Sequence, residues 1–255
     1  MLQNNKEMKN PFSLEGKTIL VTGAASGIGR ATAIQCSEMG AKVILVDLNE
    51  QGLKDSKALI LRDDTEYRAL DLTDLDKLIE MVVSLPKLDG VASNAGIVLS
   101  LLAKFSEPND MERIFKINTF SHINLIQQLI TQKKLNKGAS IVFTSSMSGV
   151  YCGLAGGSLY GATKSAILGY TKALAIELAN RGIRVNTIHP GMIETPITAG
   201  TALSKELLEE DAKNYPLGRY GKPEEIAYSI VYLLSDATAW MTGTQLLIDG
   251  GYSVK

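Results

Sequence analysis

Cysteine is scarce in this chain of 255 residues, which has only Cys36 and Cys152. The two residues lie far apart in the sequence, and their spacing fits no metal-binding pattern. We therefore expect free thiols in a reducing compartment, no disulfide framework and no metal site.

Neither an excess of charge nor a long apolar run is present. The 26 Lys and Arg residues nearly balance the 27 Asp and Glu residues, which disfavours binding to nucleic acid or to anionic membrane surfaces. The opening residues 1–10 lack the apolar core of a signal peptide, and no apolar run is long enough to span a bilayer. We expect a cytoplasmic protein that contacts neither nucleic acid nor membrane.

What the chain does have is the composition of an ordinary globular protein, with 45% hydrophobic and 21% charged residues. Its length would suit one large α/β domain or two small ones. Because no repeat, low-complexity stretch or Pro/Gly-rich linker divides it, we expect a single domain over residues 14–255 and a loose polar arm over residues 1–13.

The apolar pattern predicts strands that alternate with helices along the whole chain. Strands are expected at residues 17–22, 42–46, 67–70, 88–92, 140–144, 184–188 and 245–248, and helices at 28–39, 50–61, 74–84, 110–132, 159–180 and 223–234. Nearly continuous apolar strands between amphipathic helices are typical of a parallel sheet covered on both faces. We therefore predict an α/β fold with a doubly wound parallel sheet of about seven strands.

Three glycines, Gly23, Gly27 and Gly29, lie between the first predicted strand and the first predicted helix. Glycine permits a tight turn and lets the backbone approach a pyrophosphate at a helix N-terminus, where free N–H groups favour anions. Such glycines could also serve packing alone. The strand before them and the helix after them favour dinucleotide binding.

Asp47 ends the second predicted strand. A carboxylate there can accept hydrogen bonds from both hydroxyls of the adenosine ribose, and it repels a 2′-phosphate. The alternative role is that of an aspartate that caps the next helix or stabilises a turn. Its place beside the glycine segment favours ribose binding, so we predict NAD(H) rather than NADP(H). Arg30, the nearest basic residue, is expected to face solvent.

Tyr160 and Lys164 are four residues apart, so they share one face of a helix. An ammonium favours the charged form of a neighbouring phenol, whose ordinary pKa is about 10, and so allows proton exchange near neutral pH. Tyr-x-x-x-Lys is common by chance, and the pair taken alone could be an ordinary surface pair.

Taken together, the glycine segment, Asn94-Ala95-Gly96 and the Tyr160/Lys164 pair resemble the short-chain dehydrogenase/reductase family in order and spacing. The resemblance covers residues 14–251. It implies a Rossmann-type fold and an NAD(P)-dependent oxidoreductase that interconverts a secondary alcohol and a ketone. It also implies a homotetramer built on the fourth and fifth helices.

The resemblance implies a catalytic group of Asn118, Ser146, Tyr160 and Lys164. Tyr160 would be the general acid/base on the substrate oxygen, while Lys164 would lower its pKa and bind the nicotinamide ribose. Ser146 would hydrogen-bond the same substrate oxygen, and Asn118 would support a water-mediated proton path.

Ser146 has two rivals, Ser145 and Ser148, and is preferred because it stands three residues before Gly149, in the family's Ser-x-x-Gly pattern. It lies fourteen residues before the tyrosine, one more than is usual in the family. We expect the glycine-rich loop 153–157 to absorb the extra residue. Ser93 stands where the family usually has a second asparagine.

The cofactor contacts carry over from the resemblance residue by residue. They are Gly23, Ser26, Gly27, Ile28, Gly29, Asp47, Leu48, Asp71, Leu72, Asn94, Ala95, Gly96, Tyr160, Lys164, Pro190, Gly191, Ile193 and Thr195. Asp71 and Leu72 would border the adenine, and Ile193 and Thr195 would contact the carboxamide.

Residues 192–215 are where this family keeps a mobile substrate lid, and here the segment is mostly acidic. That charge does not encourage a phosphorylated or carrier-bound substrate. Residues 190–195 and 221–225 nevertheless resemble 3-oxoacyl-(acyl-carrier-protein) reductases, which commonly prefer NADP(H). The same segments are also similar to those of sugar, polyol and steroid dehydrogenases of the family, so the substrate stays open. A 3-oxoacyl-(acyl-carrier-protein) reductase is one alternative to an NAD(H)-dependent dehydrogenase, and a catalytically silent dinucleotide-binding scaffold is another.

Three further residues are expected to have no chemical role. His189 is expected to be a strand-end residue rather than a base, and His122 to lie at the surface or at a subunit interface. Cys152 lies near the expected substrate mouth but has no basic neighbour to activate it.

Overall fold

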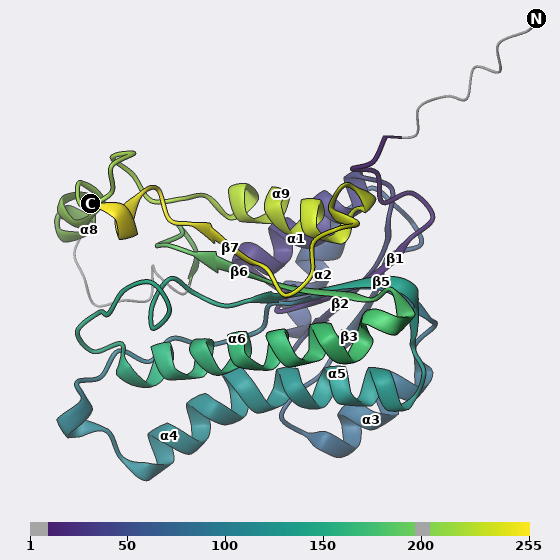
Figure 1. Ribbon diagram of the computed structural model, residues 1–255, viewed down its shortest axis with the longest axis horizontal. Helices are drawn as coiled ribbons and strands as arrows, with labels where there is room; N and C mark the ends of the chain where they lie inside the picture. The colour runs from purple at the N-terminus through teal and green to yellow at the C-terminus, as the bar shows by residue number, and fades with distance from the viewer. Residues whose placement is uncertain (1–9, 197–204) are drawn as a thin grey trace, which may run out of the picture.

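The fold is built around one parallel sheet, seen in a computed structural model that describes residues 10–196 and 205–255 (Figure 1). Its strands are β1 (Thr18–Thr22), β2 (Lys42–Asp47), β3 (Glu66–Ala69), β4 (Leu88–Ser93), β5 (Leu135–Thr144), β6 (Arg184–Pro190) and β7 (Gln245–Ile248). They lie in the order β3-β2-β1-β4-β5-β6-β7, and every pairing is parallel. The prediction of a doubly wound α/β sheet is confirmed.

Helices cover both faces of the sheet (Figure 1). They are α1 (Gly27–Glu38), α2 (Glu50–Ala58), α3 (Leu75–Ser84), α4 (Pro108–Phe115), α5 (Ser121–Thr131), α6 (Ser158–Leu178), α8 (Lys205–Ala212) and α9 (Pro223–Leu234). One face is covered by α1, α2 and α9, and the other by α3, α5 and α6. Each face carries its own buried apolar cluster.

Strand β1 shows how the sequence supplies both clusters. Leu20 packs in the cluster under α3, α5 and α6, whereas its neighbours Ile19 and Val21 pack in the cluster under α1, α2 and α9. All three side chains are fully buried. Alternate side chains of a strand point to opposite faces, so a continuous apolar run is what a sheet buried on both sides requires.

The long helix expected at residues 110–132 is interrupted. It starts earlier, as α4, and a π-helical turn over Lys116–Phe120 separates α4 from α5. Helical backbone continues through both junctions, so the interruption is a bulge rather than a break. Such bulges re-aim one side chain and occur frequently at functional sites. Here the side chain inside the bulge is that of Asn118.

Strand β5 is longer than expected, because Leu135 pairs with Leu88 before the register shifts and the ladder resumes at Ser140. Gly138, at φ +80°, interrupts the extended backbone between these two pairings, so the apolar pattern did not predict the first part of the strand. The other predicted elements agree with the structure to within three residues at each end, and the bounds of α9 and β7 match in full.

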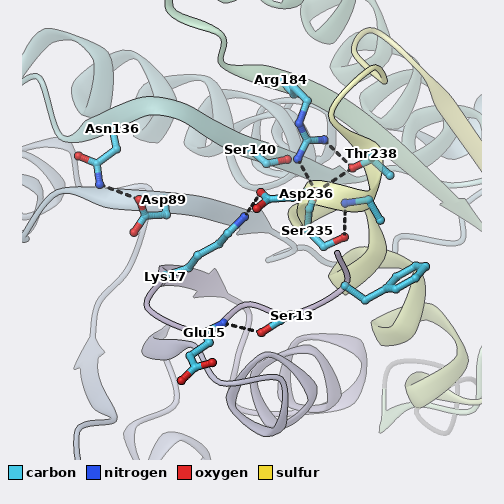
Figure 2. Close-up of polar contacts among 12 residues, drawn as sticks. Ser13, Glu15, Lys17, Asp89, Asn136, Ser140, Arg184, Ser235, Asp236 and Thr238 are labelled. Carbon is cyan, nitrogen blue, oxygen red and sulfur yellow. Dashed lines mark hydrogen bonds and ion pairs between the residues drawn. The ribbon is translucent and has the colours of Figure 1, made fainter. Parts of the chain in front are cut away.

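The edge of the sheet where the strands begin is held by a buried arginine (Figure 2). Arg184, at the start of β6, is 8% exposed and donates to the carbonyls of Leu233 and Ser235, at 2.8 and 3.0 Å. It also donates to Thr238 Oγ1 at 2.7 Å. These carbonyls lie at the C-terminal end of α9, where helix carbonyls lack partners and the dipole favours a cation.

The described end of the N-terminal segment is anchored rather than loose. The Pro11 carbonyl accepts the backbone N–H of Ala237, and the Phe12 ring stacks on Tyr232 with centroids 6.0 Å apart. The remainder of the expected arm lies outside the described residues. Over the described ranges, no helix is both long enough and apolar enough to cross a membrane.

Candidate functional site

The glycine segment forms a turn that leaves no room for side chains. A Cβ on Gly29 would lie 2.0 Å from the Gly23 carbonyl oxygen, and one on Gly23 would lie 2.9 Å from Ala95 Cα. Gly23 and Gly27 also have positive φ angles, of 68° and 52°. Only glycine tolerates this combination of close approach and left-handed backbone.

The turn ends at the N-terminus of α1, which carries no acidic residue in its first turn. Ser26 stands at the N-cap position but makes no capping hydrogen bond with its side chain. The first N–H groups of the helix are therefore available to an anion. This bare cradle fits the pyrophosphate of a dinucleotide.

Thr22 connects the turn to the neighbouring strand β4. Its fully buried Oγ1 accepts the backbone N–H of Asn94 at 2.9 Å and that of Ala95 at 3.1 Å. The carboxyl ends of β1 and β4 are thereby held together where the strand order reverses, which is where open α/β sheets bind ligands. Thr22 was not among the predicted site residues, although it opens the glycine motif.

Asp47 lies beside the glycine turn. Its Oδ2 accepts the backbone N–H of Ala25 at 3.1 Å, and its Oδ1 accepts that of Asn49 at 2.9 Å. Asn49, rather than Asp47, caps α2 by accepting the N–H of Gly52. Asp47 therefore does not cap α2, but its bond from the N–H of Asn49, two residues on, is that of a turn aspartate, the other alternative role. Its carboxylate lies at the end of β2 beside the glycine turn.

The expectation that Arg30 faces solvent is wrong. The guanidinium is part-buried and donates to the Ala25 carbonyl at 2.5 Å and to Ser56 Oγ at 2.9 Å. The side chain folds back because the carbonyls of the turn and of α2 lie within its reach. Arg30 thus braces the turn between α1 and α2.

The residues expected around the adenine differ in exposure. Leu48 is 71% exposed, and Asp71 is exposed with its Oδ1 accepting the N–H of Thr73. Leu72 is buried in the apolar core, so its side chain is turned away from the surface. At this edge, Leu48 and Asp71 offer side chains to a ligand, while Leu72 supports the loop from beneath.

Asn118 is held in the π-helical turn by the backbone of Ile97. Its Oδ1 accepts the N–H of Ile97, and its Nδ2 donates to the carbonyl of the same residue, both at 2.8 Å. Nδ2 also lies 3.3 Å from Thr163 Oγ1. These two hydrogen bonds to the backbone of one residue join the helix to the loop after Gly96, and the amide is fully buried.

Lys164 reaches the end of strand β5. Its Nζ donates to the Thr144 carbonyl at 2.9 Å and lies 5.8 Å from the centre of the Tyr160 ring. A Cβ on Gly96 would stand 3.4 Å from this ammonium and 3.2 Å from Asn118 Oδ1. Burial lowers the pKa of Lys164 to about 8.

Tyr160 and Ser146 are within hydrogen-bonding distance of each other, although the loop between them has one residue more than is usual in the family. Burial raises the pKa of Tyr160, and a hydrogen bond from Ser146 offsets part of that rise. The net change in the phenol pKa is thus upward, opposite to the lowering expected from Lys164. The phenol is neutral over the physiological pH range.

The two rival serines make contacts through different groups, Ser145 through its hydroxyl and Ser148 through its backbone N–H. Ser145 Oγ donates to the Lys164 carbonyl at 2.9 Å, and the backbone N–H of Ser148 donates to Ser146 Oγ at 3.1 Å. Within the loop, the Gly149 N–H donates to the Cys152 carbonyl at 2.8 Å, which closes a tight turn. That turn lies just before the predicted loop 153–157.

Both histidines of the chain are buried. His122 is 2% exposed, so the prediction that it lies at the surface is wrong. Its Nδ1 lies 2.6 Å from Ser93 Oγ, and its Nε2 lies 2.7 Å from the Ala95 carbonyl oxygen. Burial lowers its pKa to about 3. Ser93, which replaces the usual asparagine, is therefore the hydroxyl partner of this imidazole. His189 is fully buried at the end of β6, as expected for a strand-end residue.

Residues 190–196 pass over the glycine turn. The side chain of Thr195 comes close to it, since a Cβ on Gly27 would lie 3.1 Å from Thr195 Cγ2. Ile193 is 5% exposed and packs in the core, so only its backbone is presented to the site. Gly191 lies against the backbone of Asp249, with Pro190 buried beside it at the end of β6. Of the expected lid, residues 197–204 lie outside the described residues.

Comparison with known proteins identifies the family. The profile described as enoyl-(acyl carrier protein) reductase matches residues 23–253. The 3-oxoacyl-(acyl-carrier-protein) reductase of Thermotoga maritima is 38% identical over 244 residues, which cover 93% of this chain and 98% of the relative. The chain belongs to the short-chain dehydrogenase/reductase family. It is an oxidoreductase of the NAD(P)-dependent kind that acts on CH–OH or carbonyl groups.

Two solved structures of this family closely resemble the chain. A candidate short-chain alcohol dehydrogenase from Sinorhizobium meliloti superposes with a TM-score of 0.89 at 31% identity, covering 96% of this chain and all of the other. A candidate NAD(P)-dependent gluconate 5-dehydrogenase from Beutenbergia cavernae, with NADP bound at low occupancy, gives 0.88 at 31% identity and the same coverage.

The sequence patterns did not predict the residues that hydrogen-bond to the site residues and fix their positions. They are Thr22, Ile97, Thr144, Thr163 and His189. Most act through a backbone group or a small hydroxyl, which no residue pattern marks. Among the described residues, no cluster of His, Cys, Asp and Glu could hold a metal ion.

Proposed function

We propose that this short-chain dehydrogenase/reductase reduces a ketone to a secondary alcohol, with Tyr160 as the proton donor. The grouping of Tyr160 with Ser146 and with Lys164, whose Nζ lies 5.8 Å from the centre of the phenol ring, carries the proposal. Burial raises the pKa of the phenol, so it keeps a proton to give at physiological pH. The reverse reaction needs the phenolate and is favoured only at higher pH.

The substrate proposed is the ketone of a 3-oxoacyl thioester. Support comes from the Thermotoga maritima relative, which is named for that reaction and aligns over nearly its whole length. A buried apolar group of Met147, Tyr215 and Tyr220, with Cys152 and Met192 packed against it, adjoins the loop that carries Ser146. Such surroundings suit an acyl chain better than a polyol.

NADH is the cofactor proposed. The Asp47 carboxylate at the end of β2 repels a 2′-phosphate, and the basic side chain nearest the turn, Arg30, is engaged with Ala25 and Ser56. The alternative is NADP(H), which is bound in the Beutenbergia cavernae structure. A direct comparison of the two cofactors decides between them.

In the proposed mechanism, the bound nicotinamide supplies the hydride. Gly23, Gly27 and the α1 N-terminus would hold the pyrophosphate, and Asp47 would hold the adenosine ribose. Ser146 donates a hydrogen bond to the ketone oxygen and stabilises the charge that develops there. Tyr160 then gives its proton to that oxygen.

Lys164 and Asn118 would then help Tyr160 to regain a proton. The Lys164 ammonium, held by the Thr144 carbonyl, stabilises the phenolate left behind. Asn118, fixed by both backbone groups of Ile97, keeps a polar group beside Lys164 where water can return the proton. The chain thus places a proton donor, a hydrogen-bond donor to the ketone oxygen and a route for reprotonation around the phenol oxygen of Tyr160.

The test is a panel of ketones with each cofactor, followed by NADH or NADPH absorbance. The panel contains 3-oxoacyl thioesters on coenzyme A and on acyl carrier protein, oxo acids, keto sugars and steroid ketones. We expect the highest kcat/KM with a 3-oxoacyl thioester and NADH. A higher kcat/KM with NADPH would refute the cofactor proposal, and no turnover across the panel would favour a silent scaffold.

The homotetramer implied by the family resemblance remains a prediction. Phe120, at the end of the π-helical turn, is 52% exposed, and Ile176 on α6 is 80% exposed. Both lie on the helices through which that assembly would form. Light scattering of the purified protein is expected to give four times the chain mass.

A further inference from the structure

His189 makes a contact that the proposed mechanism does not use. The residues on either side of Ser146 donate their backbone N–H groups to the carbonyls of Ile188 and Pro190, at 2.8 and 3.0 Å. Between these two bonds, the carbonyl of Ser146 itself lies 2.9 Å from Nδ1 of the His189 side chain. The imidazole thus completes the connection between the end of β5 and the end of β6.

The partners define the state of the imidazole. A carbonyl oxygen can only accept, so Nδ1 carries the proton and donates it to Ser146. Nε2 is then an acceptor, and Thr187 Oγ1 lies 2.8 Å away to donate to it. The ring is fully buried, and Tyr151 packs edge-on against it with centroids 5.4 Å apart. A neutral ring with one tautomer is what these contacts require.

We propose that His189 is a positioning residue for Ser146, holding the peptide of that serine so that its hydroxyl faces the substrate oxygen. The hydroxyl oxygen is three bonds from the clamped carbonyl carbon, through Cα and Cβ, so rotation of the peptide displaces it. Ser148 N–H donates to the same Oγ at 3.1 Å, which leaves little freedom to compensate. Displacements of about 1 Å in such a group cost rate rather than binding.

The chemistry of asparagine and glutamine supplies a matched pair of variants. The side-chain amide of Asn places a donor near the position of Nδ1, whereas that of Gln places one near Nε2. His189→Asn therefore keeps the hydrogen bond to Ser146, and His189→Gln loses it. We expect kcat to fall about tenfold in His189→Gln and to stay within about threefold of wild type in His189→Asn.

A double-mutant cycle with Ser146→Ala tests whether the effect passes through Ser146. The inference rests on the proposed role of that serine, whose removal is expected to lower kcat about 100-fold. In the Ser146→Ala background, His189→Gln should change kcat by less than about twofold. NADH binding and thermal unfolding are measured for every variant, and both are expected to stay near wild type in His189→Asn.

Each outcome bears on the proposal. Equal losses in the Asn and Gln variants, full activity of His189→Gln, or independent effects in the double variant would overturn the positioning role alone. Full activity of Ser146→Ala would overturn both this role and the proposed function of Ser146. A kcat loss confined to His189→Gln, and absent when Ser146 is alanine, supports it.

Discussion

Lys164 donates a 2.9 Å hydrogen bond to the backbone carbonyl of Thr144, the last residue of strand β5. The ammonium is therefore held by a neutral carbonyl, and it lies 5.8 Å from the centre of the Tyr160 ring. Burial is what moves the pKa of this group, to about 8, and it moves it downward. A lysine in this state is charged at neutral pH and loses its charge in mild alkali.

The first prediction concerns the pH dependence of the reaction. Since the pKa of Lys164 is about 8, the rate of ketone reduction should fall roughly tenfold per pH unit above that value as the ammonium loses its proton. Single-turnover rates from pH 6 to pH 10 measure this, with cofactor affinity followed at each pH. A rate that stays level up to pH 10 would contradict the assigned role.

The second prediction concerns the proton donor. Tyr160→Phe removes the hydroxyl and should lower kcat by about 1,000-fold or more, while the affinity for NADH stays within about twofold. Tyr170→Phe on the same helix is the matched control, because its ring packs against Phe143 away from Ser146. The mechanism fails if Tyr160→Phe turns over normally or if both variants lose activity equally.

The third prediction concerns cofactor choice. Asp47→Ser removes the carboxylate beside the Ala25 amide, so the ratio of kcat/KM for NADH over NADPH should drop at least about tenfold. Asp55→Ser, on exposed α2, serves as a control for loss of a surface charge. Equal changes in both variants, or no change in Asp47→Ser, would remove Asp47 from ribose recognition.

The fourth prediction uses the buried His122. Its pKa of about 3 lies below the ordinary value of 6.5. Between these two pH values, His122 is therefore protonated in the unfolded chain but neutral in the folded chain. The free energy of unfolding should therefore decline with falling pH between about 6.5 and 3. This residue should contribute about 1.4 kcal/mol per pH unit to that slope.

His122→Gln isolates the contribution, because the amide can still donate to the Ala95 carbonyl but does not titrate. Urea unfolding at a series of pH values should give a shallower acid slope for the variant than for the wild type. Equal acid slopes for the variant and the wild type would mean that the pKa of His122 is the same in the folded and the unfolded chain.

The fifth prediction concerns the arginine in Figure 2. Arg184→Met leaves the C-terminal carbonyls of α9 without a donor and should lower the free energy of unfolding by about 3 kcal/mol. Arg62→Met, which breaks an exposed ion pair with Asp64, should lower the free energy of unfolding far less, because exposed ion pairs contribute little. Comparable losses in the two variants would show that burial of Arg184 adds nothing.

The sequence by itself determined the order of strands and helices and the glycine turn. Apolar runs in strands such as β1 and the Pro-led helix α9 are local signals, legible from a few neighbouring residues. Gly29 is required by a contact with Gly23 only six residues away, so its motif is local as well. Tyr160 and Lys164 share a helix, which is why their spacing predicted their proximity.

Only the tertiary structure decided what holds the site. His122 meets Ser93, His189 meets Ser146, and Lys164 meets a backbone carbonyl, each from an element distant in sequence. Burial then set the pKa of Tyr160 against the direction expected from its charged neighbour. Desolvation and long-range hydrogen bonds arise only when the strand ends are assembled at one edge of the sheet, so no local pattern carries them.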